Sequence, residues 1–207
     1  MNQNTTSPYS VARTSAWLIA IVLLSASAIW GRIPVFLFFN HNFGSIADTI
    51  LLGFTYLAEG WAWIPYLIIA GWFFKKDKWI IVYSFAISTL LTQIPKQIFF
   101  PTITRPIASG IDTNQIHTIK GVAMHQLNSF PSGHTATAFT IFLLTVYLFK
   151  HNKLVLIGLI YAMLCGYSRI YLGQHFPMDV GGGIIVAIIT VEISKRIRKN
   201  ANDIKEN

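Results

Sequence analysis

The sequence predicts an all-α protein whose helices form a polytopic bundle across a membrane. Of its 207 residues, 53% are hydrophobic and only 12% are charged, whereas a soluble domain carries about 25% charged residues. The apolar residues gather in runs close to the roughly 20 residues that cross a bilayer. The cationic residues gather between these runs, which is the distribution that sets the orientation of a membrane protein.

Six apolar segments are expected to be membrane-spanning helices. They comprise residues 15–39, 46–74, 79–100, 135–149, 154–172 and 179–193. In the first segment, Gly31, Arg32 and Pro34 interrupt the apolar run, which predicts a bend near its outer end. In the second, Glu59 and Gly60 end an early part that can lie along the membrane surface. The third is long enough to cross the bilayer.

The last three segments depend on their flanking residues. The fourth and the sixth are short for a full span. The turn at 131–134 would extend the fourth at its start, and Lys195 can snorkel from the end of the sixth. The fifth has the length of an ordinary span. It contains the sole cysteine, Cys165, which permits no intrachain disulfide and is expected to be a buried, inert thiol.

The net charge of +8 is compatible with nucleic-acid binding, but the distribution of the cations argues against that partner. They cluster in residues 75–78, 150–153 and 195–199, which the positive-inside rule places in the cytoplasm. Six helices then leave both termini on that side. The chain accordingly divides into a cytoplasmic N-terminal tail (1–14), a six-helix transmembrane domain (15–199) whose motifs lie within 96–179, and a disordered cytoplasmic C-terminal tail (200–207).

The first polar motif is Pro-Ser-Gly-His at residues 131–134. Gly133 allows close approach to the backbone, and the N–H groups and positive dipole of the helix that follows favour an anion such as phosphate. Ser132 can add a hydroxyl donor, or it can act as an ordinary helix N-cap. Capping does not require His134 at the membrane boundary, and this residue favours a functional site.

The second motif contains Arg169, His175 and Asp179. Arginine binds phosphate oxygens through two parallel hydrogen bonds and keeps its charge. A histidine nitrogen can attack phosphorus if a carboxylate holds its other nitrogen, and Asp179 is the only acid near His175 in the sequence. An acid at a helix start also complements the helix dipole, and the two roles are compatible. The glycines 181–183 are expected to allow close helix packing.

Lys96 and Arg105 complete the set of candidate residues. Both would lie near the outer membrane boundary, where a lysine can also snorkel and an arginine can be a solvated surface charge. Arg105 belongs to a long outer connection, residues 101–132, which can cover the site as a lid. Two further histidines of this loop, His117 and His125, are expected to be surface residues or substrate contacts.

Together these blocks resemble the type 2 phosphatidic acid phosphatase superfamily, which also includes vanadium haloperoxidases. Its signature is a lysine, six residues and Arg-Pro; then Pro-Ser-Gly-His; then Ser-Arg, five residues, His, three residues and Asp. The second and third blocks match at every position, and the resemblance covers roughly residues 79–195. In the first block, eight residues separate Lys96 from Arg105, and a bulge near Pro101 would restore the geometry.

The resemblance implies a role for each matching residue. His175 would be the nucleophile that forms a phosphohistidine, Asp179 would orient it, and His134 would be the general acid. The phosphate would be held by Lys96, Arg105 and Arg169, with Ser132 and the Gly133 N–H stabilising the transition state. Phosphoryl transfer mainly needs positioning and charge stabilisation, and fixed cations supply both. No carboxylate cluster suited to magnesium is recognisable, so neither a metal nor a cofactor is expected.

The expected function is that of a metal-independent lipid phosphatase in a bacterial inner membrane, with its site at the outer, periplasmic face. Undecaprenyl diphosphate is the first expected substrate. Lipid A, phosphatidylglycerol phosphate, phosphatidic acid and lipid-to-lipid phosphotransfer remain alternatives. Two further alternatives are a vanadate-dependent haloperoxidase, against which the apolar spans argue, and a non-catalytic carrier or scaffold. The oligomeric state is left open.

Overall fold

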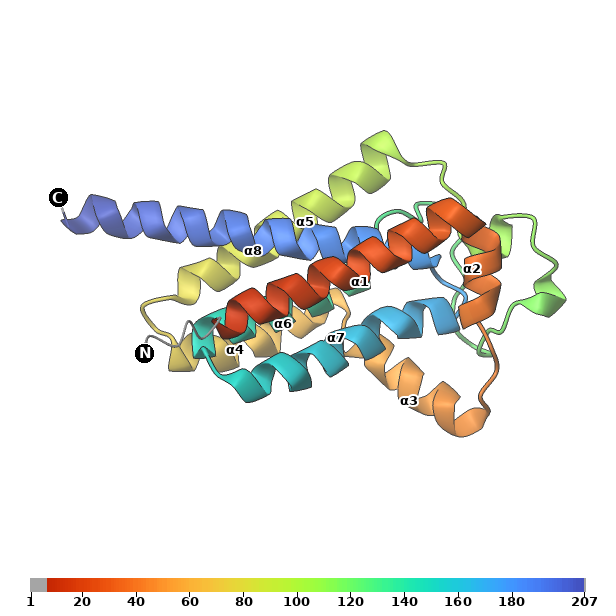
Figure 1. Ribbon diagram of the computed structural model, residues 1–207, viewed down its shortest axis with the longest axis horizontal. Coiled ribbons are helices and arrows are strands. Elements are labelled where there is room, and N and C mark those ends of the chain that lie inside the picture. Colours follow the sequence, from red (N-terminus) through yellow and green to blue (C-terminus); the bar gives the residue numbers. More distant parts are fainter. Residues whose placement is uncertain (1–6, 207) are drawn as a thin grey trace, which may run out of the picture.

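The computed structural model describes residues 7–206, which form a bundle of helices (Figure 1). The α-helices are α1 (Pro8–Trp30), α2 (Arg32–Phe39), α3 (Ser45–Tyr56), α4 (Trp63–Phe73), α5 (Lys78–Ile94), α6 (Gly133–Phe149), α7 (Asn152–Tyr171) and α8 (Pro177–Glu206). The shorter turns are η1 (Gly60–Ala62), η2 (Pro95–Phe99), η3 (Pro106–Ala108) and η4 (Thr113–Gln115). No strand occurs among the described residues, and the all-helical prediction is confirmed.

Helix α8 is the centre of the bundle and packs against α1, α5 and α6. The start of α1 and the end of α8 lie at one end of the bundle, whereas α2, α3 and the long loop lie at the other (Figure 1). Ala12, Ala16 and Ala20 of α1 are fully buried and lie on one helix face, since they are four residues apart. Small side chains at such an interface allow two helix backbones to approach closely.

The outward faces of the bundle are strongly apolar. Leu18, Val22, Ile68, Trp72 and Ile157 are each more than half exposed, although large apolar patches are unusual on soluble proteins. In the described part of the chain, three helical segments are long and apolar enough to cross a membrane: Pro8–Trp30, Asn152–Tyr171 and Pro177–Ala201. Two shorter apolar helices, Gly60–Phe73 and Gly133–Phe149, accompany them. This surface fits an integral membrane protein.

The first expected span is longer than predicted and is bent. Helix α1 already begins at Pro8, because Ser7 accepts a hydrogen bond from the Ser10 N–H at 3.2 Å and proline suits the first helical position. Residues 8–14, expected as part of a tail, are therefore helical, and residues 1–6 lie outside the described residues. The predicted bend falls at Gly31, whose φ of +85° separates α1 from α2.

The second and the last expected segments also differ in their bounds. Residues 46–74 form two α-helices, α3 and α4, that are separated near Glu59 and Gly60 as anticipated. Helix α8 continues to Glu206, so the tail expected to be disordered from Asn200 is helical as far as the structure describes it. The lysine and arginine residues before Asn200 have good helix propensity. Asn207 lies outside the described residues.

The glycines of α8 pack closely, as the sequence predicted. A Cβ atom on Gly183 would lie 2.6 Å from the Ser132 carbonyl oxygen and 2.9 Å from Thr135 Cβ. We expect Gly183→Ala to push α6 away from α8 and to destabilise the protein by about 1–3 kcal/mol. The unfolding temperature in detergent micelles measures this loss.

The matched control for this substitution is Gly53→Ala. Gly53 lies within α3, and a Cβ atom there would meet no heavy atom within 4 Å. Alanine is the better helix former by up to about 1 kcal/mol, so this variant should unfold at the wild-type temperature or above it. Equal unfolding temperatures for the two variants would contradict the close packing of α6 on α8.

Candidate active site

A cavity of about 480 Å³ lies where α5, α6 and α7 meet the long loop. Six of the eight residues predicted for the site line it: Lys96, Arg105, Gly133, His134, Arg169 and His175. Asp179 contacts His175, and Ser132 caps α6. The structure thus brings together residues that are up to 83 positions apart in the chain.

Three cations are concentrated in this cavity. Lys96 is carried by the π-helical turn η2, Arg105 precedes η3, and Arg169 lies in the last turn of α7. They are 9%, 7% and 6% exposed, respectively. No acidic residue is among the described residues that line the cavity. Buried charges are costly unless they are paired, so this arrangement favours a bound anion.

The eight-residue interval between Lys96 and Arg105 is accommodated by the irregular end of α5. The Phe100 N–H donates to the Pro95 carbonyl at 2.8 Å, which is the i→i+5 bond of a π-helical turn. Such turns are frequent at functional sites. Lys96 therefore lies in the same cavity as Arg105 in spite of the longer spacing.

The guanidinium group of Arg105 is held in place by backbone oxygens. Its Nε donates to the Leu127 carbonyl at 3.0 Å, and its Nη1 donates to the Gln174 carbonyl at 3.2 Å. Nη1 also lies 3.4 Å from Nε2 of His175. These contacts fix the orientation of a group that can bind two phosphate oxygens at once.

Two lining side chains carry buried polar atoms without a partner. Nη1 of Arg169 donates to Thr55 Oγ1 at 3.3 Å. Within residues 7–206, however, neither Arg169 Nε nor His134 Nε2 has a hydrogen-bond partner. A buried group left unsatisfied costs about 1–3 kcal/mol. A phosphate in the cavity would provide an acceptor oxygen for Nε of Arg169. It would also provide one for Nε2 of His134 when this nitrogen carries a proton.

His175 and Asp179 form a buried pair behind the cations. Nδ1 of His175 lies 3.3 Å from Asp179 Oδ2, and the same oxygen accepts from Ser129 Oγ at 2.5 Å and from the Phe176 N–H at 2.9 Å. The Asp179 carbonyl accepts from the Ser132 N–H at 2.9 Å. This last bond ties the second block of the signature to the third.

The surroundings of His175 define its protonation state. Arginine has donors only, so Nε2, which faces Arg105, is the acceptor, and Nδ1 carries the proton that is donated to Asp179. Burial and the positive charges of Arg105, Lys96 and Arg169 lower the pKa of His175 well below 6.5. The imidazole is therefore neutral, and Nε2 keeps a lone pair at the edge of the cavity.

Ser132 and Gly133 begin helix α6. The Ser132 hydroxyl oxygen accepts from the Thr135 N–H at 3.4 Å and from the Thr135 hydroxyl at 2.9 Å, so its observed role is that of an N-cap. Gly133 lines the cavity, and a Cβ atom there would lie 3.9 Å from Lys96 Nζ. The absent side chain keeps the helix start open to a ligand beside Lys96.

Comparison with known proteins agrees with this geometry. The model of the PAP2 superfamily matches residues 77–203, which is more than half of the chain. The chain belongs to the PAP2 superfamily. The family predicted from the sequence is thereby confirmed.

Individual PAP2 relatives are similar to different extents. The chain is 28% identical to phosphatidylglycerophosphatase B of Bacillus subtilis, over 69% of this chain and 70% of that relative. It is 40% identical to undecaprenyl-diphosphatase BcrC of the same organism over 74 residues, which are 35% of this chain and 37% of BcrC. The chain thus matches little more than a third of the length of BcrC.

Two solved PAP2 structures share the fold. The crystal structure of LpxE from Aquifex aeolicus superposes with a TM-score of 0.69 and 31% identity, covering 80% of this chain and 94% of that one. The phosphatidylglycerolphosphate phosphatase of Bacillus subtilis superposes with a TM-score of 0.66 and covers 91% of this chain and 96% of that one. At 24% identity, the second comparison concerns the fold alone.

Two residues around the PAP2 motifs were not predicted from the sequence. Ser129 donates a hydrogen bond to Asp179. The backbone carbonyl of Gln174 accepts from Arg105, and the side-chain amide of Gln174 donates to the Ala123 carbonyl at 3.0 Å. Neither residue belongs to a sequence motif whose spacing would indicate a role in the site. Gln174 lies directly before His175, and this adjacency was the one available signal.

The two loop histidines have different positions. His125 lines the cavity together with His134, so the long loop reaches over the site. Burial and the positive charges of Arg105, Arg169 and Lys96 lower the pKa of His125. His117 does not line this cavity in the described structure, and its Nε2 lies 3.0 Å from Asp48 Oδ1 on α3.

Proposed function

We propose that this protein is an integral membrane phosphatase that hydrolyses a phosphate monoester or diphosphate of a lipid. The observation that carries the proposal is a neutral histidine, His175, at the edge of a cavity that gathers three buried cations. The cations would hold the phosphate, and His175 would attack it. The enzymes named among the relatives act on undecaprenyl diphosphate, phosphatidylglycerophosphate and lipid A, which supports a lipid substrate.

The geometry suggests a two-step reaction. Nε2 of His175 attacks phosphorus. At the same time, Nη1 of Arg105 gives up its contact with Nε2 and donates a hydrogen bond to a phosphate oxygen. The bond from phosphorus to the leaving oxygen breaks, and that oxygen takes a proton from His134, which can carry this proton once the negative phosphate offsets the charges of the three cations. Asp179 stabilises the positive charge that develops on the imidazole of His175. His134 then takes a proton from water, whose oxygen attacks phosphorus. The bond between phosphorus and Nε2 of His175 breaks, which releases phosphate and restores the neutral imidazole.

An apolar groove beside the cavity supports a lipid tail on the substrate. The groove has a volume of about 250 Å³ and lies between α4 and α5. It is lined by Gly60, Trp63, Ile64, Leu67, Ile81, Val82 and Phe85. Three of these residues, Gly60, Trp63 and Phe85, also line the cavity that contains His175, to which we refer as the catalytic cavity. The phosphate and the first part of an isoprenoid or acyl chain could therefore bind side by side, and undecaprenyl diphosphate remains our first expected substrate.

We propose that six segments cross the bacterial inner membrane, with both termini in the cytoplasm and the cavity at the outer face. The crossing segments would be α1, η1 with α4, α5, α6, α7 and α8. The basic clusters at 75–78, 150–153 and 195–199 lie at connections or helix ends remote from the cavity residues. They support this orientation, because cytoplasmic loops are enriched in lysine and arginine.

Single cysteines test the orientation. Cysteines introduced by Lys76→Cys and Asn152→Cys should be shielded from an impermeant thiol reagent in intact cells, whereas one introduced by Gln115→Cys should be labelled. The native Cys165 is fully buried and gives a low background. Labelling of all three after cell lysis is the control for reactivity. The reverse pattern in intact cells would overturn the orientation.

Phosphate release is the direct test of the proposed function. The purified protein in detergent is given undecaprenyl diphosphate, lipid A, phosphatidylglycerol phosphate and phosphatidic acid, with a chelator present. We expect release to continue, because Lys96, Arg105 and Arg169 supply the positive charge that a metal would otherwise supply. Release that stops with the chelator and returns with a divalent cation would overturn metal independence.

Further measurements on the same purified protein separate the alternatives. Oxidation of halide in the presence of vanadate and peroxide would indicate a haloperoxidase. Phosphate that appears on a second lipid would indicate phosphotransfer. No phosphate release or transfer with any lipid would contradict the proposed function.

The pH profile tests the role of the lowered pKa of His175. The acidic limb of the kcat/KM profile reports the pKa values of the essential ionisable groups in the free enzyme. Because cations and burial keep His175 neutral below its usual pKa of 6.5, we expect activity to persist below pH 6.5 and to fall when either His175 or its partner Asp179 becomes protonated. Arg105→Gln removes a neighbouring positive charge and should move this limb to higher pH. The ionisation of the substrate, followed by phosphorus NMR, is the control, and an acidic limb above pH 6.5 would contradict this role.

A further inference from the structure

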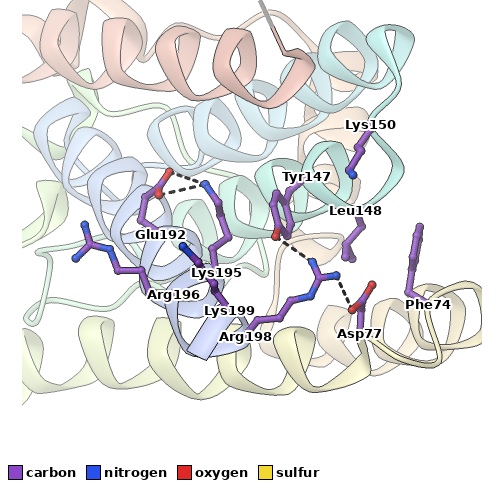
Figure 2. Close-up of a pocket in the computed structure, with 10 residues that line it drawn as sticks. All are labelled: Phe74, Asp77, Tyr147, Leu148, Lys150, Glu192, Lys195, Arg196, Arg198 and Lys199. Carbon is purple, nitrogen blue, oxygen red and sulfur yellow. Dashed lines mark hydrogen bonds and ion pairs between the residues drawn. The ribbon is translucent and has the colours of Figure 1, made fainter. Parts of the chain in front are cut away.

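A second cavity, of about 720 Å³ (Figure 2), lies beside the later turns of α8, whereas His175 comes just before the start of that helix. It is formed by the turn between α4 and α5, the end of α6 and the later turns of α8. Its lining comprises Phe74, Asp77, Tyr147, Leu148, Lys150, Glu192, Lys195, Arg196, Arg198 and Lys199. None of these residues lines the catalytic cavity, so we refer to this one as the basic cavity.

The basic cavity has an excess of positive charge. Five of its lining residues are lysine or arginine and two are acidic, which leaves a surplus of three positive charges. Both carboxylates are already paired: Asp77 lies 2.7 Å from Arg198, and Glu192 lies 3.1 Å from Arg13 and 3.2 Å from Lys195. The surplus therefore comes from Lys150, Arg196 and Lys199.

Arg198 is fixed in the basic cavity and still offers a donor. Its Nη2 binds Asp77 and its Nη1 donates to the Tyr147 hydroxyl at 2.9 Å, so that its side chain lies between these two residues (Figure 2). Its Nε is buried and has no hydrogen-bond partner among residues 7–206. An immobilised guanidinium with an unused donor is suited to a phosphate oxygen.

The position of the basic cavity matches the edge of a bilayer. Asp179 and Arg198 are nineteen residues apart on α8, which corresponds to about 29 Å along a helix. The hydrocarbon core of a bilayer is about 30 Å thick. If Asp179 lies near one boundary, Arg198 lies near the other. The lining also includes Phe74 and Leu148, which can contact the apolar part of a lipid.

We propose that the basic cavity binds the phosphate headgroup of an anionic phospholipid from the leaflet opposite the catalytic cavity. The phosphate would lie among Arg196, Lys199 and the free Nε of Arg198, with the glycerol and upper chain against Phe74 and Leu148. Basic pockets between transmembrane helices bind anionic headgroups by the same attraction. The bound lipid is not a substrate, since His175 lies at the other end of α8.

Lipid binding to the purified protein tests the proposal. Native mass spectrometry counts phosphatidylglycerol or phosphatidylcholine bound in detergent as each lipid is titrated. We expect tighter binding of phosphatidylglycerol. Arg196→Gln/Lys199→Gln should weaken it about 30-fold, because each cation near an anionic headgroup contributes about a factor of five.

The matched control is Lys76→Gln/Lys153→Gln. It removes the same charge from two exposed positions at the same end of the molecule but leaves the basic cavity intact, so binding should stay within about twofold of the wild type. Unfolding temperatures without lipid establish that each variant is folded. Equal weakening by both double variants, no weakening by either, or equal affinity for phosphatidylcholine would overturn the proposal.

Free phosphate and glycerol 3-phosphate distinguish the possible sources of the ligand. Displacement of phosphatidylglycerol by millimolar glycerol 3-phosphate would support recognition of the headgroup alone. If glycerol 3-phosphate fails to compete while the selective loss in Arg196→Gln/Lys199→Gln persists, the lipid chain is also needed, as contact with Phe74 and Leu148 predicts. Tighter binding of inorganic phosphate than of the lipid would overturn the assignment to a membrane lipid.

Discussion

His175→Ala is expected to lower kcat for phosphate release by about 10⁴-fold or more, since losing the nucleophile of a catalytic unit costs that much in well-studied hydrolases. The cations do not depend on the imidazole for their positions, because Arg105 is held by the carbonyls of Leu127 and Gln174. Substrate should therefore still bind. The loss should appear in kcat with KM changed much less, which would separate a chemical role from a binding role.

A labelled phosphoenzyme provides the second measurement. In a single turnover with a radioactive lipid phosphate, the wild type should form an acid-labile phosphoprotein, and His175→Ala should form none. The matched control is His41→Ala, because His41 is exposed and does not line the catalytic cavity of the described structure. Turnover by His175→Ala within tenfold of the wild type would mean that water attacks phosphorus directly.

The relative positions of the proposed catalytic groups could be predicted from the sequence, because they follow from local structure. His175 and Asp179 are four residues apart at the start of a helix, and the N–H groups of Gln174 and His175 both donate to the Arg169 carbonyl. A short segment therefore determines how Arg169, His175 and Asp179 lie relative to one another. The bend at Gly31 was predictable for the same reason, since glycine accepts a positive φ.

The hydrogen bonds that hold these side chains in place could not be predicted, because they join segments that are distant in the sequence. Ser129 reaches Asp179 across 50 positions, and Gln174 reaches Arg105 across 69. No periodicity in the sequence indicates either pair. The basic cavity also depends on such contacts. In the sequence, residues 195–199 indicate only the orientation in the membrane, whereas the packing of α8 beside Tyr147 and Asp77 makes four of them line a cavity.

Asp179→Asn is expected to lower kcat by about 10⁴-fold, as the same change does in the carboxylate–histidine pair of serine proteases. Oδ2 of Asp179 accepts from Ser129, Phe176 and His175. If the amide oxygen took this place, the bonds would remain, but the negative charge that stabilises the charged imidazole would be lost. If the amide nitrogen faced Nδ1 instead, the proton of His175 would move to Nε2 and remove the attacking lone pair.

Steady-state kinetics and thermal unfolding together distinguish this role from a structural one. An amide nearly preserves the shape of the carboxylate, so Asp179→Asn should bind substrate with a KM close to that of the wild type and form little phosphoenzyme. Asp112→Asn is the matched control, because Asp112 is exposed in the long loop and asparagine caps a helical turn as well as aspartate does. Activity of Asp179→Asn within tenfold of the wild type, with a lowered unfolding temperature, would mean that Asp179 serves only to order the start of α8. A loss of kcat with an unchanged unfolding temperature would mean that its charge acts on His175 during phosphoryl transfer.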